Sequence, residues 1–363
     1  MTIHRTTRRR ALSLLALTPL AAVLVACGDD SDDSGESGSG GSGAAAELRL
    51  GYFANVTHAA ALIGVEQGLF EAELGDTELS TQVFNAGPDV VEAVFGGALD
   101  AAYIGPSPAI NAYGQSQGDA VRIISGAASG GAQLVVRDGI DAPEDLEGTT
   151  LATPQLGNTQ DVALRTWLTE EGLENSIEGG GDVTIAPTAN ADTLALFQSG
   201  DLDGAWLPEP WASRLVLEAG AHVLVDERDL WPGGEFVTTN IIVRTEYLEE
   251  NPEAVEALLR GHVAAVQLAQ DDPEAAQTAV NAGLEAAGSS ALAAEVLDRA
   301  WSNLSVTWDP LAETLEESAQ HSFDAGTTPE LVDIEGIYDL RPLNAVLSDL
   351  DLEPVSAGGL GEA

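Results

Sequence analysis

The chain has 363 residues, of which 44% are hydrophobic, a composition typical of a folded protein and not of a disordered one. The chain has 59 acidic residues and 14 basic ones, all of them arginine, and its formal net charge is −45. Such an excess of negative charge disfavours nucleic acid and anionic lipid surfaces as partners. The single cysteine, Cys27, excludes an internal disulfide framework and a zinc site built on several thiolates.

Residues 1–27 have the pattern of an export signal. Four arginines between positions 5 and 10 precede an apolar run over Ala11–Ala26, which is short for a membrane span. The run ends in Leu24-Val25-Ala26-Cys27, which resembles a bacterial lipobox and predicts lipidation of Cys27 after cleavage. The alternative is an ordinary secreted protein with an incidental cysteine. Thr7–Leu12 also resembles a loose twin-arginine signal, which leaves the export route open.

The segment 28–46 follows as a flexible acidic tether. Gly28–Gly43 contains glycine, serine and acidic residues and no apolar side chain to bury. Loss of the signal would leave 10 basic residues against all 59 acidic ones. We therefore expect a folded part that begins near Ala46 and is held outside the cell, with a lipid anchor as its only membrane contact.

Short apolar runs then alternate with helical patterns, which predicts parallel sheets with right-handed crossovers. The first set of strands is expected at Leu48–Tyr52, Leu79–Phe84, Asp100–Ile104 and Val121–Ser125, with helices at Ala59–Phe70, Pro88–Phe95 and Pro106–Gln115. The second set has strands at Thr150–Thr153, Val183–Pro187 and Leu202–Trp206, with helices at Gln160–Glu171 and Ala191–Phe197. Two sets predict two α/β lobes.

The last third of the chain changes character. "EFVTTNIIVRTEYL" is typical of a strand that returns the chain to the first lobe. Long helical patterns follow at Pro252–Gln270, Pro273–Ala287 and Ser290–Trp301. The predicted organisation is therefore a first lobe over 47–137, a second lobe over 138–237, and a return to the first lobe with a helical region over 238–363.

The turns after the predicted strands carry the candidate site, because ligands of open α/β sheets bind at the carboxyl ends of strands. These turns are Phe53–His58, Gly105–Pro108, Ser129–Gln133, Gly157–Gln160 and Pro208–Trp211. Four of them contain small or hydroxyl residues, which let backbone N–H groups approach a ligand. Facing turns with helix N-termini would bind an anion without lysine. The alternative for Gly157–Gln160 is a plain helix cap.

Three blocks resemble a known family: "LGYFANVTHAAALIGVEQGLF", "FNAGPDVVEAVFGGALDAAYIGPSPAI" and "GAWLPEPWASRL". They are similar to the solute-binding proteins of nitrate, sulfonate and taurine importers, over about Leu48–Leu268. The resemblance implies a two-lobed periplasmic-binding-protein fold of type II, a monomer that closes on its ligand, and delivery of the ligand to an ABC permease and its ATPase. The ligand-binding residues it implies are Asn55, Thr57, His58, Ser107, Ser129, Gln133, Asn158, Thr159, Glu209, Trp211 and Thr239, with Thr238 and Asn240 near the return strand.

Some of these residues have a structural alternative. His58 could cap a helix or fill the edge of the core, and Trp211 could serve packing alone. Glu209 would repel an anion unless it is paired, protonated or metal-bound. Arg165 or Arg214 could neutralise it. Glu209 argues against nitrate and favours an organic anion, such as an aliphatic sulfonate, or a zwitterion such as taurine, whose ammonium group it could meet.

An enzyme is not expected. The sequence contains no Ser-His-Asp spacing, no H-E-x-x-H and no G-x-x-x-x-G-K loop. With Cys27 as the only cysteine, the Cys-rich iron motif of the related thiamine-pyrimidine synthase is absent. We expect no cofactor and no metal. Two alternatives stay open: a binder of nitrate, bicarbonate or a pyrimidine precursor, and a surface-tethered sensor module.

Overall fold

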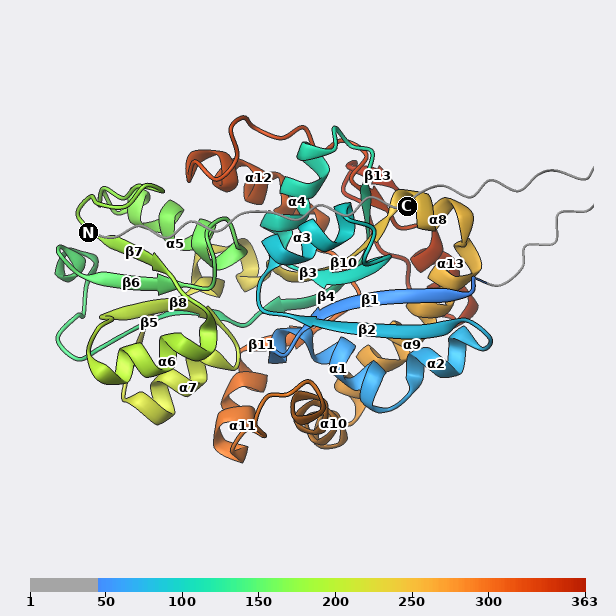
Figure 1. Ribbon diagram of the computed structural model, residues 1–363, viewed down its shortest axis with the longest axis horizontal. Coiled ribbons are helices and arrows are strands. Elements are labelled where there is room, and N and C mark those ends of the chain that lie inside the picture. Colours follow the sequence, from blue (N-terminus) through green and yellow to red (C-terminus); the bar gives the residue numbers. More distant parts are fainter. Residues whose placement is uncertain (1–44) are drawn as a thin grey trace, which may run out of the picture. The chain divides into compact units, whose positions relative to one another are not determined.

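The structure is a computed structural model that describes residues 45–363. The predicted export signal, Cys27 and the tether up to residue 44 lie outside the described residues. The strands form two sheets, and each sheet is covered by helices on both faces (Figure 1).

The first sheet has eight strands in the order β13-β12-β4-β10-β3-β1-β2, with β11 paired to β4. Its strands are β1 Glu47–Phe53, β2 Glu78–Phe84, β3 Ala101–Ile104, β4 Val121–Gly130, β10 Val237–Arg244, β11 Leu304–Val306, β12 Tyr338–Asp339 and β13 Gly361–Glu362. β1 is parallel to β2 and β3, whereas β10 is antiparallel to both of its neighbours, β3 and β4.

The second sheet has five strands in the order β7-β6-β8-β5-β9. Its strands are β5 Ala132–Val136, β6 Thr150–Thr153, β7 Thr184–Pro187, β8 Gly204–Pro208 and β9 His222–Asp226. β6 is parallel to β7 and β8, and β5 is antiparallel to β8 and β9. The predicted two-lobed α/β architecture is confirmed.

The helices are α1 Ala59–Glu66, α2 Leu69–Leu74, α3 Gly87–Phe95, α4 Pro106–Gln115, α5 Thr159–Glu170, α6 Asn190–Ser199, α7 Trp211–Ala219, α8 Thr245–Glu250, α9 Pro252–Asp271, α10 Pro273–Ala286, α11 Ala294–Ser302, α12 Leu315–Asp324 and α13 Arg341–Asp349. The predicted helix over Ala59–Phe70 is interrupted, because Gly68 adopts a left-handed backbone with a φ of 64° between α1 and α2. Such a conformation suits glycine and ends a helix.

Alternating side chains give the first sheet two cores. Leu48, Leu50 and Tyr52 of β1 pack with α1, α9 and α10, whereas Phe53 packs on the opposite face with α3 and α4. This alternation follows from the two-residue period of a strand. The second sheet is built in the same way, with α5 on one face and α6 and α7 on the other.

The chain crosses between the sheets twice. The first crossing is at Gly130 and Gly131, whose φ values of 73° and 78° turn β4 into β5. β5 lies inside the range expected for the first lobe, 47–137, but it pairs with β8 and β9 in the second sheet. The second crossing runs through two 3₁₀ turns, Glu227–Leu230 and Pro232–Gly234, into β10. β10 is the predicted return strand, and α9, α10 and α11 follow it.

Candidate functional site

A small cavity of about 20 Å³ lies between the two sheets at the carboxyl ends of their parallel strands. A volume of this size is close to that of one water-sized probe. The first lobe contributes the ends of β1, β2 and β3 and the start of β10, and the second lobe contributes the starts of α5 and α6 and the end of β8. The lining residues are Phe53, Asn55, Thr57, His58, Asn85, Gly105, Pro154, Asn158, Thr159, Gln160, Asn190, Pro208, Thr238 and Thr239.

His58 is held as a neutral donor on the first-lobe side. It ends the 3₁₀ turn Val56–His58 that follows β1, and only 2% of it is exposed. Burial lowers the pKa of His58 to about 3, so the ring is uncharged at neutral pH. The backbone N–H of Phe53 donates to Nδ1 over 3.3 Å. The proton of the neutral ring is therefore on Nε2, which makes Nε2 a hydrogen-bond donor.

Asn158 joins the two lobes from the start of α5. Its Oδ1 accepts a hydrogen bond of 3.1 Å from the backbone N–H of Gly87, at the start of α3 in the first lobe. Its Nδ2 donates to Gln160 Oε1 over 3.0 Å. Asn158 occupies the N-cap position, but its side chain makes no capping hydrogen bond. The capping alternative therefore does not explain Asn158.

Thr159 presents a buried hydroxyl without a partner. It is the first residue of α5, and Oγ1 makes no hydrogen bond among the described residues. A buried hydroxyl left unpaired costs about 1–3 kcal/mol, so it needs a partner in the cavity that it lines, either a water molecule or a ligand. The first lobe approaches this hydroxyl closely, because a Cβ built on Gly105 would lie 2.2 Å from Oγ1. Only glycine at 105 permits this contact between the lobes.

The electrostatics of the cavity suit an anion. None of the lining side chains carries a charge at neutral pH, with His58 neutral. Two helices of ten or more residues, α5 and α6, begin at the cavity with Asn158 and Ala189 at their N-cap positions, whereas α4 begins with Pro106, which has no N–H. The first N–H groups of a helix have no partner inside it and carry the positive end of its dipole. These groups can bind an anion without a cationic side chain.

Glu209 does not line this cavity. It is fully buried, and its carboxylate accepts hydrogen bonds from Arg299 Nη1 at 3.2 Å, Asn303 Nδ2 at 2.6 Å and the backbone N–H of Ser213 at 3.1 Å. Burial raises the pKa of Glu209, and these donors oppose the rise. Its charge is therefore balanced inside the protein by Arg299, at the end of α11.

Neither arginine predicted to neutralise Glu209 does so. Arg165 pairs with Asp161 at 2.9 Å, and Arg214 pairs with Glu218 at 3.1 Å. Each of these pairs spans four residues of one helix. The partner Arg299 is 90 residues from Glu209 in the sequence, so no local pattern points to it.

The other predicted residues fall into three groups. Asn55, Thr57, Thr238 and Thr239 line the cavity, as do His58, Asn158 and Thr159. Trp211 lies next to it, and its Nε1–H donates to Asn55 Oδ1 over 2.9 Å. The structure places the remaining residues elsewhere. Ser107 and Ser129 are buried in α4 and β4, Gln133 bonds Asp226 and Arg299, and Asn240 is buried without a side-chain hydrogen bond among the described residues.

The sequence analysis missed two polar lining residues. Asn85 follows β2, and Asn190 begins α6 after β7. Gln160, which also lines the cavity, lies in the predicted turn Gly157–Gln160. Asn190 Oδ1 is buried and has no partner within residues 45–363. The rule that strand ends carry the site would have found Asn85 and Asn190 if it had been applied after β2 and β7.

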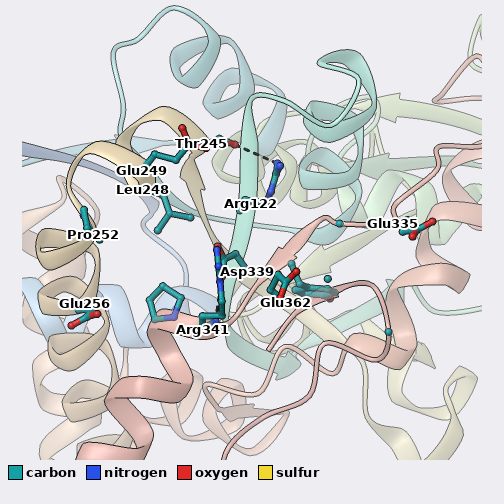
Figure 2. Close-up of a pocket in the computed structure, with 15 residues that line it drawn as sticks. Arg122, Thr245, Leu248, Glu249, Pro252, Glu256, Glu335, Asp339, Arg341 and Glu362 are labelled. Carbon is teal, nitrogen blue, oxygen red and sulfur yellow. Dashed lines mark hydrogen bonds and ion pairs between the residues drawn. The ribbon is translucent and has the colours of Figure 1, made fainter.

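A larger cavity lies elsewhere in the first lobe. It is an open groove of about 760 Å³ beside β4, β12 and β13 (Figure 2). Its two arginines are engaged: Arg122 donates to Thr245 and to backbone carbonyls, and Arg341 pairs with Asp339. Five carboxylates line it, those of Glu249, Glu256, Glu335, Asp339 and Glu362. This excess of negative charge disfavours an anionic ligand.

Within 45–363, no helix combines the length and the apolar character needed to cross a bilayer. No cluster of three or more His, Cys, Asp or Glu side chains suited to a metal ion occurs in that part of the chain.

Residues 41–283 match the NMT1-like family. The taurine-binding periplasmic protein of Escherichia coli is 29% identical over 202 residues, which are 54% of this chain and 59% of that protein. The match therefore spans less than two thirds of this relative's length.

Solved structures share the fold. The alkanesulfonate-binding protein SsuA from Xanthomonas axonopodis, bound to MOPS, aligns with a TM-score of 0.66 and 21% identity over 79% of this chain and 96% of its own. The periplasmic nitrate-binding protein NrtA from Synechocystis aligns with a TM-score of 0.71 and 16% identity over 88% and 92%. At these identities the likeness concerns the fold alone.

Proposed function

Because this chain belongs to the NMT1-like family, we propose that it is an extracytoplasmic solute-binding protein of an ABC importer, and that its ligand is a small organic sulfonate. Support comes from the relatives, one of which is named for taurine, and from a fold shared with sulfonate- and nitrate-binding proteins. The protein captures the solute between its lobes and releases it to a permease. No catalytic step is involved.

The unpartnered hydroxyl of Thr159 in an uncharged cavity is the observation that carries the proposal. A sulfonate oxygen placed there accepts hydrogen bonds from Thr159 Oγ1, from His58 Nε2 and from N–H groups at helix N-termini. Sulfonates stay ionised at all physiological pH values, so neutral donors suffice to bind them. Because donors come from both lobes, the bound anion links the lobes and stabilises the closed arrangement.

Glu209 no longer favours a zwitterion, since Arg299 already balances its charge. An ammonium group in the cavity would find no carboxylate among the lining side chains. A sulfonate without an amino group is therefore preferred over taurine. Nitrate is the second candidate, because the same neutral donors can meet its single charge.

Calorimetric titration with methanesulfonate, taurine and nitrate tests the proposal. We expect methanesulfonate to bind most tightly. Thr159→Ala should weaken this binding by roughly 1.5–3 kcal/mol, or about tenfold to over a hundredfold, because a hydrogen bond to a charged oxygen is lost. Thr169→Ala, farther along α5 with an exposed side chain, is the matched control and should bind as the wild type does. Wild-type affinity in Thr159→Ala would refute the assignment.

We also propose that lipidation of Cys27 anchors the protein to the outer face of the cell membrane. Cys27→Ala should release the protein into the medium or leave it unprocessed, as fractionation and mass spectrometry would record. A variant that stays with the membranes at full yield and normal mass would contradict the anchor. Genes for a permease and an ATPase beside its own would favour import, and a sensor kinase gene would favour the sensor alternative.

A further inference from the structure

A second cavity of about 220 Å³ adjoins the small one. The two cavities share three lining residues, Asn55, Asn85 and Asn190. Both lobes line the second cavity as well. The first lobe supplies the ends of β1 and β2 and residues 287–289 after α10, and the second lobe supplies the start of α6 and Trp211. Lobe closure therefore forms both cavities together.

The lining of the second cavity is uncharged and largely apolar. Alanine side chains at positions 54, 189, 191 and 287 alternate with the larger Val83, Phe84 and Trp211. Val83, near the end of β2, is 38% exposed. Its exposure leaves apolar surface that a ligand could cover.

Trp211 is fixed in this wall from two sides. Its Nε1–H donates to Asn55 Oδ1 over 2.9 Å, across the two lobes. The guanidinium of Arg214 lies 4.8 Å from the centre of its ring. A ring held in this way can stack on an apolar or aromatic group without losing further side-chain freedom.

We propose that the second cavity is a subsite for the uncharged organic tail of a sulfonate whose head occupies the small cavity. This inference rests on the proposed function and extends it to the class of tail. The small cavity leaves no room for a tail, and the three asparagines that it shares with the second cavity lie where the two cavities meet. A cavity of about 150 Å³ is known to hold benzene, so about 220 Å³ admits a ring or a short alkyl chain. A cationic tail has no carboxylate to meet there.

The test compares benzenesulfonate with methanesulfonate by calorimetry in the wild type and two variants. Ala191→Trp fills the second cavity from the first turn of α6, where the alanine is exposed and the helix tolerates a large side chain. Ala195→Trp places the same residue at another exposed position of α6, outside both cavities, and is the matched control. Unchanged melting temperatures of the free variants will show that both fold.

We expect the wild type and Ala195→Trp to bind benzenesulfonate at least tenfold more tightly than methanesulfonate, a difference of about 1.4 kcal/mol. Ala191→Trp should remove this preference and leave the affinity for methanesulfonate within about twofold. Equal affinities for the two ligands in the wild type, or equal losses for both in Ala191→Trp, would overturn the subsite but leave the proposed function standing. Failure of the wild type to bind either sulfonate would overturn both.

Discussion

Replacing Gly105 by alanine tests whether contact between the lobes at Thr159 governs ligand binding. Gly105 has a φ of −72° and a ψ of 160°, a conformation that alanine adopts without strain. Its added Cβ would nevertheless lie 2.2 Å from Thr159 Oγ1 in the opposite lobe, whereas the next contact across the lobes, with Thr159 Cβ, is at 3.3 Å. The substitution therefore opposes closure and leaves each lobe intact.

To relieve the contact, Thr159 must rotate about χ1 or the lobes must separate by about 1 Å at this point. Either change removes the ligand's bond to Thr159, and separation also breaks the 3.1 Å hydrogen bond from Gly87 N–H to Asn158 Oδ1. A neutral hydrogen bond contributes about 0.5–1.5 kcal/mol and one to a charged group about 1.5–3 kcal/mol. Gly105→Ala should thus weaken methanesulfonate binding by about 1.5–4 kcal/mol, or roughly tenfold to several hundredfold.

Calorimetric titration of Gly105→Ala, Thr159→Ala and the double variant separates this mechanism from a general loss of structure. Without Oγ1, the obstacle at 2.2 Å disappears, so the double variant should bind nearly as well as Thr159→Ala alone. The melting temperature of ligand-free Gly105→Ala should match the wild type. Wild-type affinity in Gly105→Ala, or an equal further loss when it is added to Thr159→Ala, would refute the reasoning.

Two further predictions concern buried carboxylates of the second lobe. Burial raises the pKa of Glu227 to about 7. Between pH 4.5 and 7 the folded state therefore binds more protons than the unfolded state. The contribution of Glu227 to stability is lost as the pH rises through that range. In the wild type, Trp206 Nε1–H donates to Glu227 Oε2 over 2.7 Å, and Glu227→Gln keeps an acceptor for this bond. In urea denaturation, the free energy of unfolding of Glu227→Gln relative to the wild type should increase by about 3 kcal/mol from pH 4.5 to pH 8. A difference that does not change with pH would contradict the buried charge. Arg299→Met should cost about 1–3 kcal/mol at pH 8, and the loss should shrink as the pH falls, because burial raises the pKa of Glu209 and protonation removes its unpaired charge. Arg260→Met, at a partly exposed ion-pair site, should cost under about 1 kcal/mol at either pH. An equal loss in both variants would count against the Glu209 pair.

The order of strands and helices could be predicted because it depends on local patterns. The alternation of Leu48, Leu50 and Tyr52 predicts β1, and the glycines at 130 and 131 decide where the chain leaves the first sheet. The expected first lobe, 47–137, includes β5, but β5 pairs with β8 and β9 in the second sheet. This pairing depends on tertiary contacts, which no local sequence pattern shows.

The site could be predicted only in part, for a similar reason. Asn55, His58 and Thr159 each lie in a turn that follows a strand, and this position predicts that they line one cavity, as the structure shows. The sequence does not show which side of a turn faces the ligand, so Gln133 was included although it bonds Asp226 and Arg299. The role of Glu209 depends on Arg299, which the fold brings to it from α11.

A crystal structure of the protein with methanesulfonate tests the central claim most directly. We predict that the anion lies between the lobes, with one sulfonate oxygen about 2.7–3.2 Å from Thr159 Oγ1 or from the first N–H groups of α5, and another within the same distance of His58 Nε2. Electron density for the anion outside the cavity lined by Asn55, His58 and Thr159, with the Thr159 hydroxyl still unpartnered, would contradict it.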